Sequence, residues 1–327
     1  MSKIRAAVVG LGQAGSRFDK DLPRVGIWTH VGAYLELHDS IDLVGAADIL
    51  LENRTHFEER CPHIPCFSTA ADMIKSVHPE IISVATPAAT HQSVIEEILK
   101  FGKPKLIVCE KPLEICNENR KRIVDSCQAA GVPCIVNYTR RYSEVYQLLK
   151  KKMDDGLIGK VRSITVFNAN RSLTMGSHAL DLLCYLSGQL PQKWVGLNNP
   201  ALFELAEPAI DFMCLFPDHV TGRILNNGFK SFRLFEVDVI GEKGRLKVPK
   251  NGERLDHIPY SQSKKFTDAT SEEMPRTLYE TKPADEAVYV TLVNEAAALV
   301  NHKMTPTCSC DVAYRTEALL EEILKIK

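Results

Sequence analysis

Short apolar runs alternate with amphipathic stretches over the first 138 residues of the chain. Apolar runs that end in glycine or in a polar residue are typical of strands buried on both faces of a parallel sheet, and the stretches between them have helical periodicity. The repetition of strand, helix and strand predicts a doubly wound α/β domain with right-handed crossovers. The predicted strands are 4–10, 41–47, 81–85, 106–109 and 133–137, and the predicted helices are 52–60, 70–77, 91–101 and 117–130.

The remaining residues, 139–327, have longer runs with partial alternation of apolar and polar positions, which favours antiparallel strands. We expect a hairpin turn at 241–244, and loops over 252–282, where the sequence is polar and weakly patterned. The predicted fold class is therefore α/β, with a doubly wound parallel sheet in residues 1–138 and an α+β domain with a large, mostly antiparallel sheet in 139–327. It stays open whether the C-terminal helix packs back on the first domain. The predicted strands here are 161–168, 209–216, 220–225, 231–240 and 245–248, and the helices are 144–153, 177–187, 286–300 and 313–325.

Composition excludes several classes of partner. The 327 residues include 40 Lys and Arg against 41 Asp and Glu, a formal net charge of −1. Non-specific nucleic-acid binding depends on a basic field, so this balance argues against a nucleic-acid partner. No apolar run approaches the roughly 20 residues that cross a bilayer, and the start of the sequence has no signal-cleavage pattern. We therefore expect no membrane partner and a cytoplasmic location.

Ten cysteines are spaced along the chain without a CxxC pair or a paired zinc knuckle. Several have apolar neighbours in the sequence, such as Cys109 and Cys184, and a free cysteine in such surroundings behaves as a small hydrophobic residue. We expect structural reduced thiols, with no metal site and no disulfide framework.

The sequence Gly-Leu-Gly-Gln-Ala-Gly follows the first predicted strand directly and opens a predicted helix. In this position the pattern is typical of a dinucleotide-binding Rossmann domain. Gly10 makes the tight turn, Gly12 lets the backbone approach the pyrophosphate, and Gly15 packs the helix against the strand. Gln13 and Ala14, at the helix start, offer backbone N–H groups to the phosphates. The alternative is a glycine-rich turn without a ligand.

Asp48 ends the second predicted strand, where a carboxylate can accept hydrogen bonds from the ribose hydroxyls. No Lys or Arg follows it directly, so a 2′-phosphate would meet a negative charge. NAD is therefore favoured over NADP as the cofactor. The alternative role for Asp48 is helix capping.

The spacing between these two features is unusual. Asp48 lies 33 residues after Gly15, where about 20 is usual. The extra residues fall within 16–34, and a loop inserted there would stand at the carboxyl ends of the strands, where ligands bind. Trp28 and His30 are therefore candidates for lining the substrate site, although a packing role for this loop is equally compatible with the sequence. The neighbouring Thr29 is a candidate cap for a restarted helix.

Glu110-Lys111-Pro112 follows another predicted strand, and together with the glycine motif it resembles the glucose-fructose oxidoreductase / inositol dehydrogenase (Gfo/Idh/MocA) family. The order and spacing of further motifs extend this resemblance from residue 4 to about residue 190, with one later match. Together the motifs are specific for the family, although not for a substrate. They are Ala85-Thr86-Pro87 with His91, Asn137 with Arg140-Arg141-Tyr142, the stretch 156–161, Gly176-Ser177-His178-Ala179-Leu180-Asp181, and 235–246.

The resemblance implies cofactor contacts by Thr86, Pro87, His91, Glu110 and Lys111. It also implies a catalytic role for Lys111. An ammonium group at the end of a parallel strand, beside the reacting oxygen, stabilises a developing alkoxide or polarises a carbonyl. A solvated surface lysine is the alternative reading of the residue alone.

His178 and Asp181 lie three residues apart on a predicted helix and so share one face. An imidazole is suited to take the hydroxyl proton while the carbon loses its hydride, and Asp181 would orient that imidazole or hold a substrate hydroxyl. The alternative is a partly buried histidine paired with a neighbouring acid. Thr174 stands where many sugar and polyol dehydrogenases of the family have aspartate. Together with Arg140 and Arg141, which could instead form surface salt bridges, it is a candidate substrate residue.

These features predict an NAD(H)-dependent oxidoreductase that transfers a hydride between nicotinamide and a secondary alcohol or ketone. The expected substrate is a sugar, a polyol or a sugar derivative, including nucleotide-linked ones. The resemblance also implies that residues 139–327 bind substrate and mediate assembly into a homodimer or homotetramer. The alternative is a non-catalytic, nucleotide-sensing regulatory protein on the same fold, since a fold alone does not fix a function.

Overall fold

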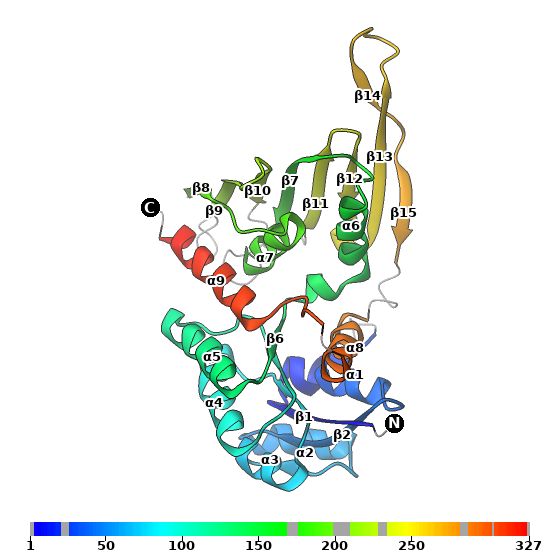
Figure 1. The fold of residues 1–327 in the computed structure, drawn as a ribbon. Coiled ribbons are helices and arrows are strands. Elements are labelled where there is room, and N and C mark those ends of the chain that lie inside the picture. Colours follow the sequence, from blue (N-terminus) through cyan, green and yellow to red (C-terminus); the bar gives the residue numbers. More distant parts are fainter. Residues whose placement is uncertain are drawn as a thin grey trace. The chain divides into compact units, whose positions relative to one another are not determined.

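The computed structural model describes residues 3–20, 26–168, 176–198, 210–227, 234–281, 287–302 and 304–325 (Figure 1). The chain divides into two compact units, which are described separately. Unit 1 comprises Met1–Tyr142 with Ala284–Arg315, and unit 2 comprises Ser143–Pro283 with Thr316–Lys327. The division therefore falls four residues after the boundary expected from the sequence, and a segment near the C-terminus is part of unit 1.

Unit 1 is built on six strands in the order β3-β2-β1-β4-β5-β6, all of them parallel. β4 and β5 are buried at every residue, as expected for strands with helices on both faces. The chain reverses its direction across the sheet between β1 and β4, which creates a crevice at the carboxyl ends of these strands. The predicted doubly wound sheet is confirmed. Its strands are β1 (Ile4–Val9), β2 (Ile41–Ala47), β3 (Cys66–Phe67), β4 (Ile81–Val84), β5 (Leu106–Glu110) and β6 (Cys134–Asn137).

Helices cover both faces of this sheet. α3, α4, α5 and the start of α9 share one apolar cluster with alternate strand residues, and α1, α2 and α8 share a second cluster with the other residues of the same strands (Figure 1). No helix within the described residues is both long and apolar enough to cross a membrane. The helices are α1 (His30–Glu36), α2 (Leu51–Arg60), α3 (Ala70–Val77), α4 (His91–Phe101), α5 (Asn117–Ala130), α8 (Val288–Asn301) and α9 (Cys310–Leu324).

The glycine motif opens a short, irregular helix. A π-helical turn, Gln13–Arg17, is followed by one 3₁₀ turn, Phe18–Lys20. Regular helix resumes only at α1, where the Thr29 hydroxyl accepts a hydrogen bond from the Gly32 N–H at 2.9 Å. Thr29 is thus the N-cap of a restarted helix, as the sequence suggested.

Unit 2 contains a nine-stranded sheet in the order β14-β13-β12-β11-β7-β10-β9-β8, with β15 paired to β13. Among the strands that the structure describes here, β7 and β10 are the one parallel pair, so the expectation of a large, mostly antiparallel sheet is confirmed. α6 (Glu144–Asp154) and α7 (Gly176–Ser187) pack with alternate strand residues in one apolar cluster. The strands are β7 (Val161–Asn168), β8 (Lys193–Asn198), β9 (Ile210–Leu215), β10 (Thr221–Asn226), β11 (Phe235–Gly241), β12 (Gly244–Val248), β13 (Arg254–Gln262), β14 (Thr270–Glu272) and β15 (Arg276–Glu280).

The expectation of loops over 252–282 is wrong, because β13, β14 and β15 occupy most of this stretch. β14 is exposed throughout and β15 almost throughout. Strands with so little burial need no apolar face, and they therefore lack the alternation that marks a strand in a sequence. The predicted hairpin is present, since β11 and β12 pair antiparallel across the turn at 241–244.

Candidate functional site

A cavity of about 600 Å³ opens at the carboxyl ends of β1, β2 and β4 in unit 1. This is the crevice that the strand order creates, and it is where doubly wound sheets bind their ligands. Small side chains and exposed backbone dominate its lining, and the described lining residues include no Lys, Arg or His. Seven of the predicted cofactor residues line it, namely Gly10, Gly12, Gln13, Ala14, Asp48, Thr86 and Pro87.

The three glycines have different environments, which match the roles expected of them. Gly10 has a φ of +91°, and a Cβ there would lie 2.6 Å from the backbone of Ala85 and Thr86. A Cβ at Gly15 would lie only 2.0 Å from the carbonyl oxygen of Gly10. A Cβ at Gly12 would meet nothing within 4 Å. Gly10 and Gly15 are thus required by the fold, whereas Gly12 keeps space open on the cavity side, as a bound pyrophosphate requires.

Asp48 follows β2 at the cavity wall and is partly exposed. Its carboxylate accepts hydrogen bonds from the backbone N–H groups of Leu11, at 2.7 Å, and Leu50, at 2.8 Å. The side-chain amide of Asn53 donates a third, at 3.0 Å. Asp48 therefore joins the glycine turn to the residues at the start of α2, but it does not cap that helix, whose N-cap is Leu50 and has no side-chain cap hydrogen bond. Its partial exposure leaves it able to meet a ligand in the cavity as well.

A buried cluster of polar side chains surrounds Glu110, the last residue of β5. One carboxylate oxygen, Oε1, lies 2.6 Å from the side-chain amide of Asn137 and 3.1 Å from the hydroxyl of Tyr289, and both groups donate to it. Nε2 of His30 lies 3.0 Å from the same oxygen. The His30 ring is fully buried and packs edge-on against the Tyr289 ring, with 5.1 Å between the centroids. We call these four side chains the Glu110 cluster.

The charge state of Glu110 follows from these contacts. Burial alone would raise the pKa of Glu110, but the hydrogen bonds from His30 and Asn137 lower it overall. The positive charge of Lys111 contributes to the same lowering. Glu110 is therefore ionised at neutral pH, and His30 donates its Nε2 proton to it. The carboxylate fixes the end of β5 directly before Lys111, which is partly buried and precedes a cis proline.

His91 connects two loops of unit 1. Its Nε2 lies 2.9 Å from the carbonyl oxygen of Thr86, and its Nδ1 lies 3.1 Å from that of Leu113. The residue is 1% exposed and does not line the cavity. His91 therefore joins the loop after β4 to the loop after β5 instead of facing a ligand in this structure.

The carboxylate of Asp19 links the two described parts of the inserted segment, 16–20 and 26–34. It accepts hydrogen bonds from the backbone N–H of Trp28, at 2.6 Å, and from the Thr29 hydroxyl. The guanidinium of Arg60, on α2, is bonded to it at 2.7 Å. Trp28 is partly buried. The segment therefore places its histidine in the core of unit 1, within the Glu110 cluster.

The candidate residues for chemistry and substrate binding are divided between the units. In unit 2, His178 and Asp181 occupy the first two turns of α7 and are 5% and 1% exposed. In unit 1, Arg140 is partly exposed, whereas Arg141 is buried and donates to the carbonyl oxygen of Thr307 at 2.7 Å. Thr174 lies outside the described residues.

Sequence reasoning missed part of the cavity wall. Asn53 lies on α2, two residues after the start of that helix, and Thr69 follows β3, so both stand at the carboxyl edge of the sheet. Ser93 and Glu97 lie four residues apart on α4 and share one face of that helix. The first pair had no clear signal, because Asn53 lies within the predicted helix 52–60 and β3, which precedes Thr69, was not among the predicted strands. Tyr289, in the Glu110 cluster, had no signal because it lies 179 residues from its partner.

Comparisons with known proteins agree with this architecture. Residues 4–138 match the family model GFO_IDH_MocA, which is described as an oxidoreductase family with an NAD-binding Rossmann fold. Inositol 2-dehydrogenase of Corynebacterium glutamicum is 29% identical over 265 residues, which cover 76% of this chain and 74% of that protein.

Two solved structures show the same fold over the full length. WlbA dehydrogenase from Bordetella pertussis, solved in complex with NADH and UDP-GlcNAcA, superposes with a TM-score of 0.75 at 20% identity and covers 99% of this chain and 97% of its own. A super-repressor mutant of Gal80p from Saccharomyces cerevisiae superposes with a TM-score of 0.79 at 18% identity and covers 99% of this chain and 96% of its own. With the glycine motif at the cavity and the Glu-Lys-Pro strand end, the chain is similar to Gfo/Idh/MocA oxidoreductases, and its residues 4–138 match the model of that family.

Proposed function

We propose that this protein is an NAD(H)-dependent dehydrogenase or reductase that acts on a secondary alcohol or ketone of a sugar, a polyol or a sugar derivative. The observation that carries the proposal is the cavity of about 600 Å³, with Gly12 open toward it and Asp48 on its wall. Support for the substrate class comes from the inositol 2-dehydrogenase relative and from the nucleotide-sugar complex of WlbA dehydrogenase.

The choice of NAD over NADP follows from charge. A 2′-phosphate beside Asp48 would meet a carboxylate, and none of the described cavity residues is basic. Arg54 is close, but its guanidinium donates to the backbone carbonyls of Asp48 and Ile49 at 2.9 Å and 3.0 Å. Ribose hydroxyls, in contrast, are donors that a carboxylate accepts well.

Lys111 is proposed as the electrophile. Its ammonium group would stabilise negative charge on the substrate oxygen during hydride transfer. The Glu110 cluster fixes the backbone immediately before it, and a fixed cationic group needs no reorganisation when charge develops.

His178 is proposed as the acid and base, with Asp181 as the residue that orients it. In oxidation the imidazole would take the hydroxyl proton, and in reduction it would return that proton; bound NAD would supply the hydride acceptor or donor. Both side chains are almost fully buried on α7, so their rotamers are restricted by packing.

The deciding experiment is a fluorescence titration of the protein with NADH, followed by a panel of sugars, polyols and sugar acids monitored through nicotinamide absorbance. We expect NADH to bind and at least one compound to oxidise or reduce the cofactor. The matched variant His178→Ala should retain NADH binding and lose about 10²- to 10⁴-fold in maximal rate.

Two outcomes separate this proposal from the regulatory alternative, which the likeness to Gal80p keeps relevant. NADH binding without turnover of any compound would favour a nucleotide-sensing protein. Full turnover by His178→Ala would remove His178 from the chemistry while leaving the dehydrogenase intact.

A further inference from the structure

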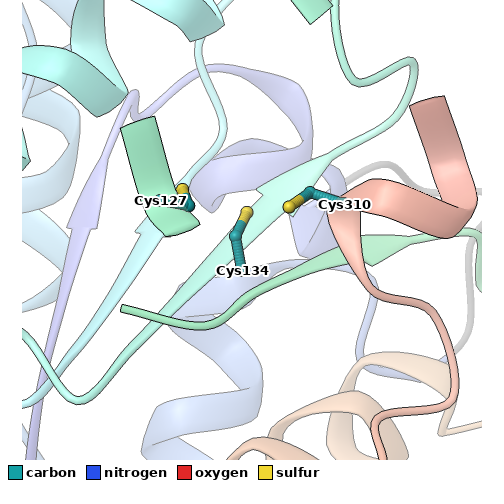
Figure 2. Close-up of side chains that lie close together, drawn as sticks. All are labelled: Cys127, Cys134 and Cys310. Atoms are coloured by element: carbon teal, nitrogen blue, oxygen red, sulfur yellow. The ribbon is translucent and has the colours of Figure 1, made fainter. Parts of the chain in front are cut away.

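Three cysteine side chains meet inside unit 1, and one of them, Cys310, is far in the sequence from the other two. Cys127 lies on α5, Cys134 on β6, and Cys310 is the first residue of α9. Their Sγ atoms all lie within 4.8 Å of one another (Figure 2). We propose that these residues, the three-thiol site, bind one thiophilic metal ion, and that this ion is Zn²⁺.

The spacing of the sulfur atoms suits a single ion. Thiolates bound to one zinc ion at about 2.3 Å lie about 3.8 to 4.0 Å from each other. The three sulfur atoms therefore need to approach one another by about 1 Å at most. Figure 2 shows the side chains converging from three separate elements, so small rotamer changes suffice and no backbone segment needs to be rebuilt.

The backbone holds the three positions in place. Cys134 lies on β6, which pairs with β5 on one side. On the other side the segment that leads into α9 pairs with β6, through a bridge between Ile135 and Ser309 and a hydrogen bond of 2.9 Å from the Val136 N–H to the Cys308 carbonyl. At the C-terminus of α5, the Cys127 carbonyl accepts a hydrogen bond of 3.0 Å from the Val132 N–H. The site is therefore pre-organised, which lowers the entropic cost of binding.

The chemistry of the donors selects the class of ion. All three ligands are sulfur, which suits zinc and softer ions and does not suit Mg²⁺ or Ca²⁺. The residues are 3%, 3% and 7% exposed and lie in an apolar cluster. In the part of the chain that the structure describes, no fourth cysteine, histidine or carboxylate joins the group. The fourth position of a tetrahedral ion would therefore be filled by a small ligand such as water.

The position of Cys310 favours a thiolate. It is the first residue of α9, where the helix dipole favours an anion. The Asp311 carboxylate opposes this, but it is half-exposed and forms an ion pair with Arg315 at 2.7 Å. A metal ion would take up this thiolate and displace the protons of the other two thiols.

The test uses the full-length protein, kept reduced with a phosphine and freed of metal. Co²⁺ is titrated in as a spectroscopic probe, and Zn²⁺ is then added in competition. We expect one Co²⁺ per chain with sulfur-to-cobalt charge-transfer absorption, its complete loss on adding one equivalent of Zn²⁺, and a rise in melting temperature with Zn²⁺. Absence of the charge-transfer band in the wild-type protein would overturn the proposal without recourse to any variant.

Variants locate the ion. Cys310→Ser and Cys127→Ala should each lower the affinity for Zn²⁺ by at least about 100-fold, since even residues behind the ligands cost 10- to 100-fold. Cys308→Ala is the matched control, because Cys308 is fully buried two residues before Cys310 and lies outside the three-thiol site. Equal loss in this control, or unchanged binding in the two ligand variants, would contradict the assignment. Far-UV circular dichroism of each variant identifies any that fails to fold.

Discussion

Two places at the carboxyl edge of the unit 1 sheet are built in opposite ways. The cavity beside β1, β2 and β4 is lined largely by small residues and uncharged polar groups, and it has room for a ligand. The Glu110 cluster at the end of β5 has no such room, because three side chains donate to one buried carboxylate oxygen. The first region leaves its polar groups available to a ligand, whereas the second uses them to fix a backbone position.

The difference separates two kinds of sensitivity. Substitutions on the open side of the cavity should alter ligand affinity without altering the folded state. Substitutions in the Glu110 cluster should alter stability and its dependence on pH, because a buried acceptor left without donors, or donors left without an acceptor, costs free energy. Four predictions test this separation, in order of expected effect.

Gly15→Ala should destabilise unit 1 the most, by about 3 kcal/mol or more, because overpacking against backbone has no cheap relaxation. The new Cβ would stand 2.0 Å from the Gly10 carbonyl oxygen. The measurement is the free energy of unfolding in denaturant. A stable, NADH-binding Gly15→Ala protein would mean that the glycine turn is more plastic than its geometry indicates.

Glu110→Gln should lower the free energy of unfolding at neutral pH by about 2 kcal/mol, the range for hydrogen bonds to a charged group. The pKa of Glu110 is lowered on folding. Its stabilising contribution is therefore complete above the unfolded-state pKa of a glutamate, about 4.3, and is lost as the pH falls through the folded-state value. Unfolding curves measured between neutral pH and acid should show this loss in the wild type and a smaller one in Glu110→Gln. Parallel pH profiles for the two proteins would contradict it.

Gly12→Ala should lower NADH affinity by about tenfold to hundredfold, because a methyl group enters the space left for the pyrophosphate. Its free energy of unfolding should change by no more than about 0.5 kcal/mol, since a Cβ there meets nothing within 4 Å. Within one motif, Gly12→Ala should therefore lower NADH affinity and leave stability almost unchanged, whereas Gly15→Ala should lower stability. A loss of stability in both variants would contradict the prediction that Gly12 is open and Gly15 is packed.

Asp48→Ala should have the smallest effect, a loss of about two- to tenfold in NADH affinity, as expected for hydrogen bonds to ribose. NADPH affinity should be measured for the same variant, because it distinguishes a ribose contact by Asp48 from the structural hydrogen bonds of Asp48 to the glycine turn. A purely structural role lowers both affinities equally, whereas a ribose contact shifts the ratio toward NADPH. An unchanged ratio would therefore remove Asp48 from cofactor choice.

Much of unit 1 was predictable because its signals are local. Ala70–Val77, His91–Phe101 and Asn117–Ala130 begin and end where the sequence places them, since periodicity, the Thr69 cap and Gly131 act over a few neighbouring residues. The cavity was predictable for the same reason, because the glycine motif and the strand ends that line it are short consecutive stretches.

Long-range groupings were not predictable. His30 lies 80 residues from Glu110, and Cys310 lies more than 170 residues from the two cysteines that it meets. Spacing rules for cysteine pairs detect only neighbours in sequence, so the expectation of structural reduced thiols without a metal site did not consider this grouping. Exposed strands such as β14 were missed for a different reason, because they bury no alternating face.

Asp19 connects the inserted segment both to α2 and, through Thr29 and His30, to the end of β5. Arg60 and Thr29 share its carboxylate, and Thr29 caps the helix that begins with His30, the partner of Glu110. Contacts thus lead from α2 through Asp19 and Thr29 to His30 and the end of β5, with the peptide link between Thr29 and His30 as one step. Segments connected in this way open together, as one cooperative unit of local unfolding. We therefore expect amide exchange in the insertion and at the end of β5 to follow one opening equilibrium. Opening would release the backbone before Lys111, so this equilibrium sets the fraction of time for which that lysine is held in place.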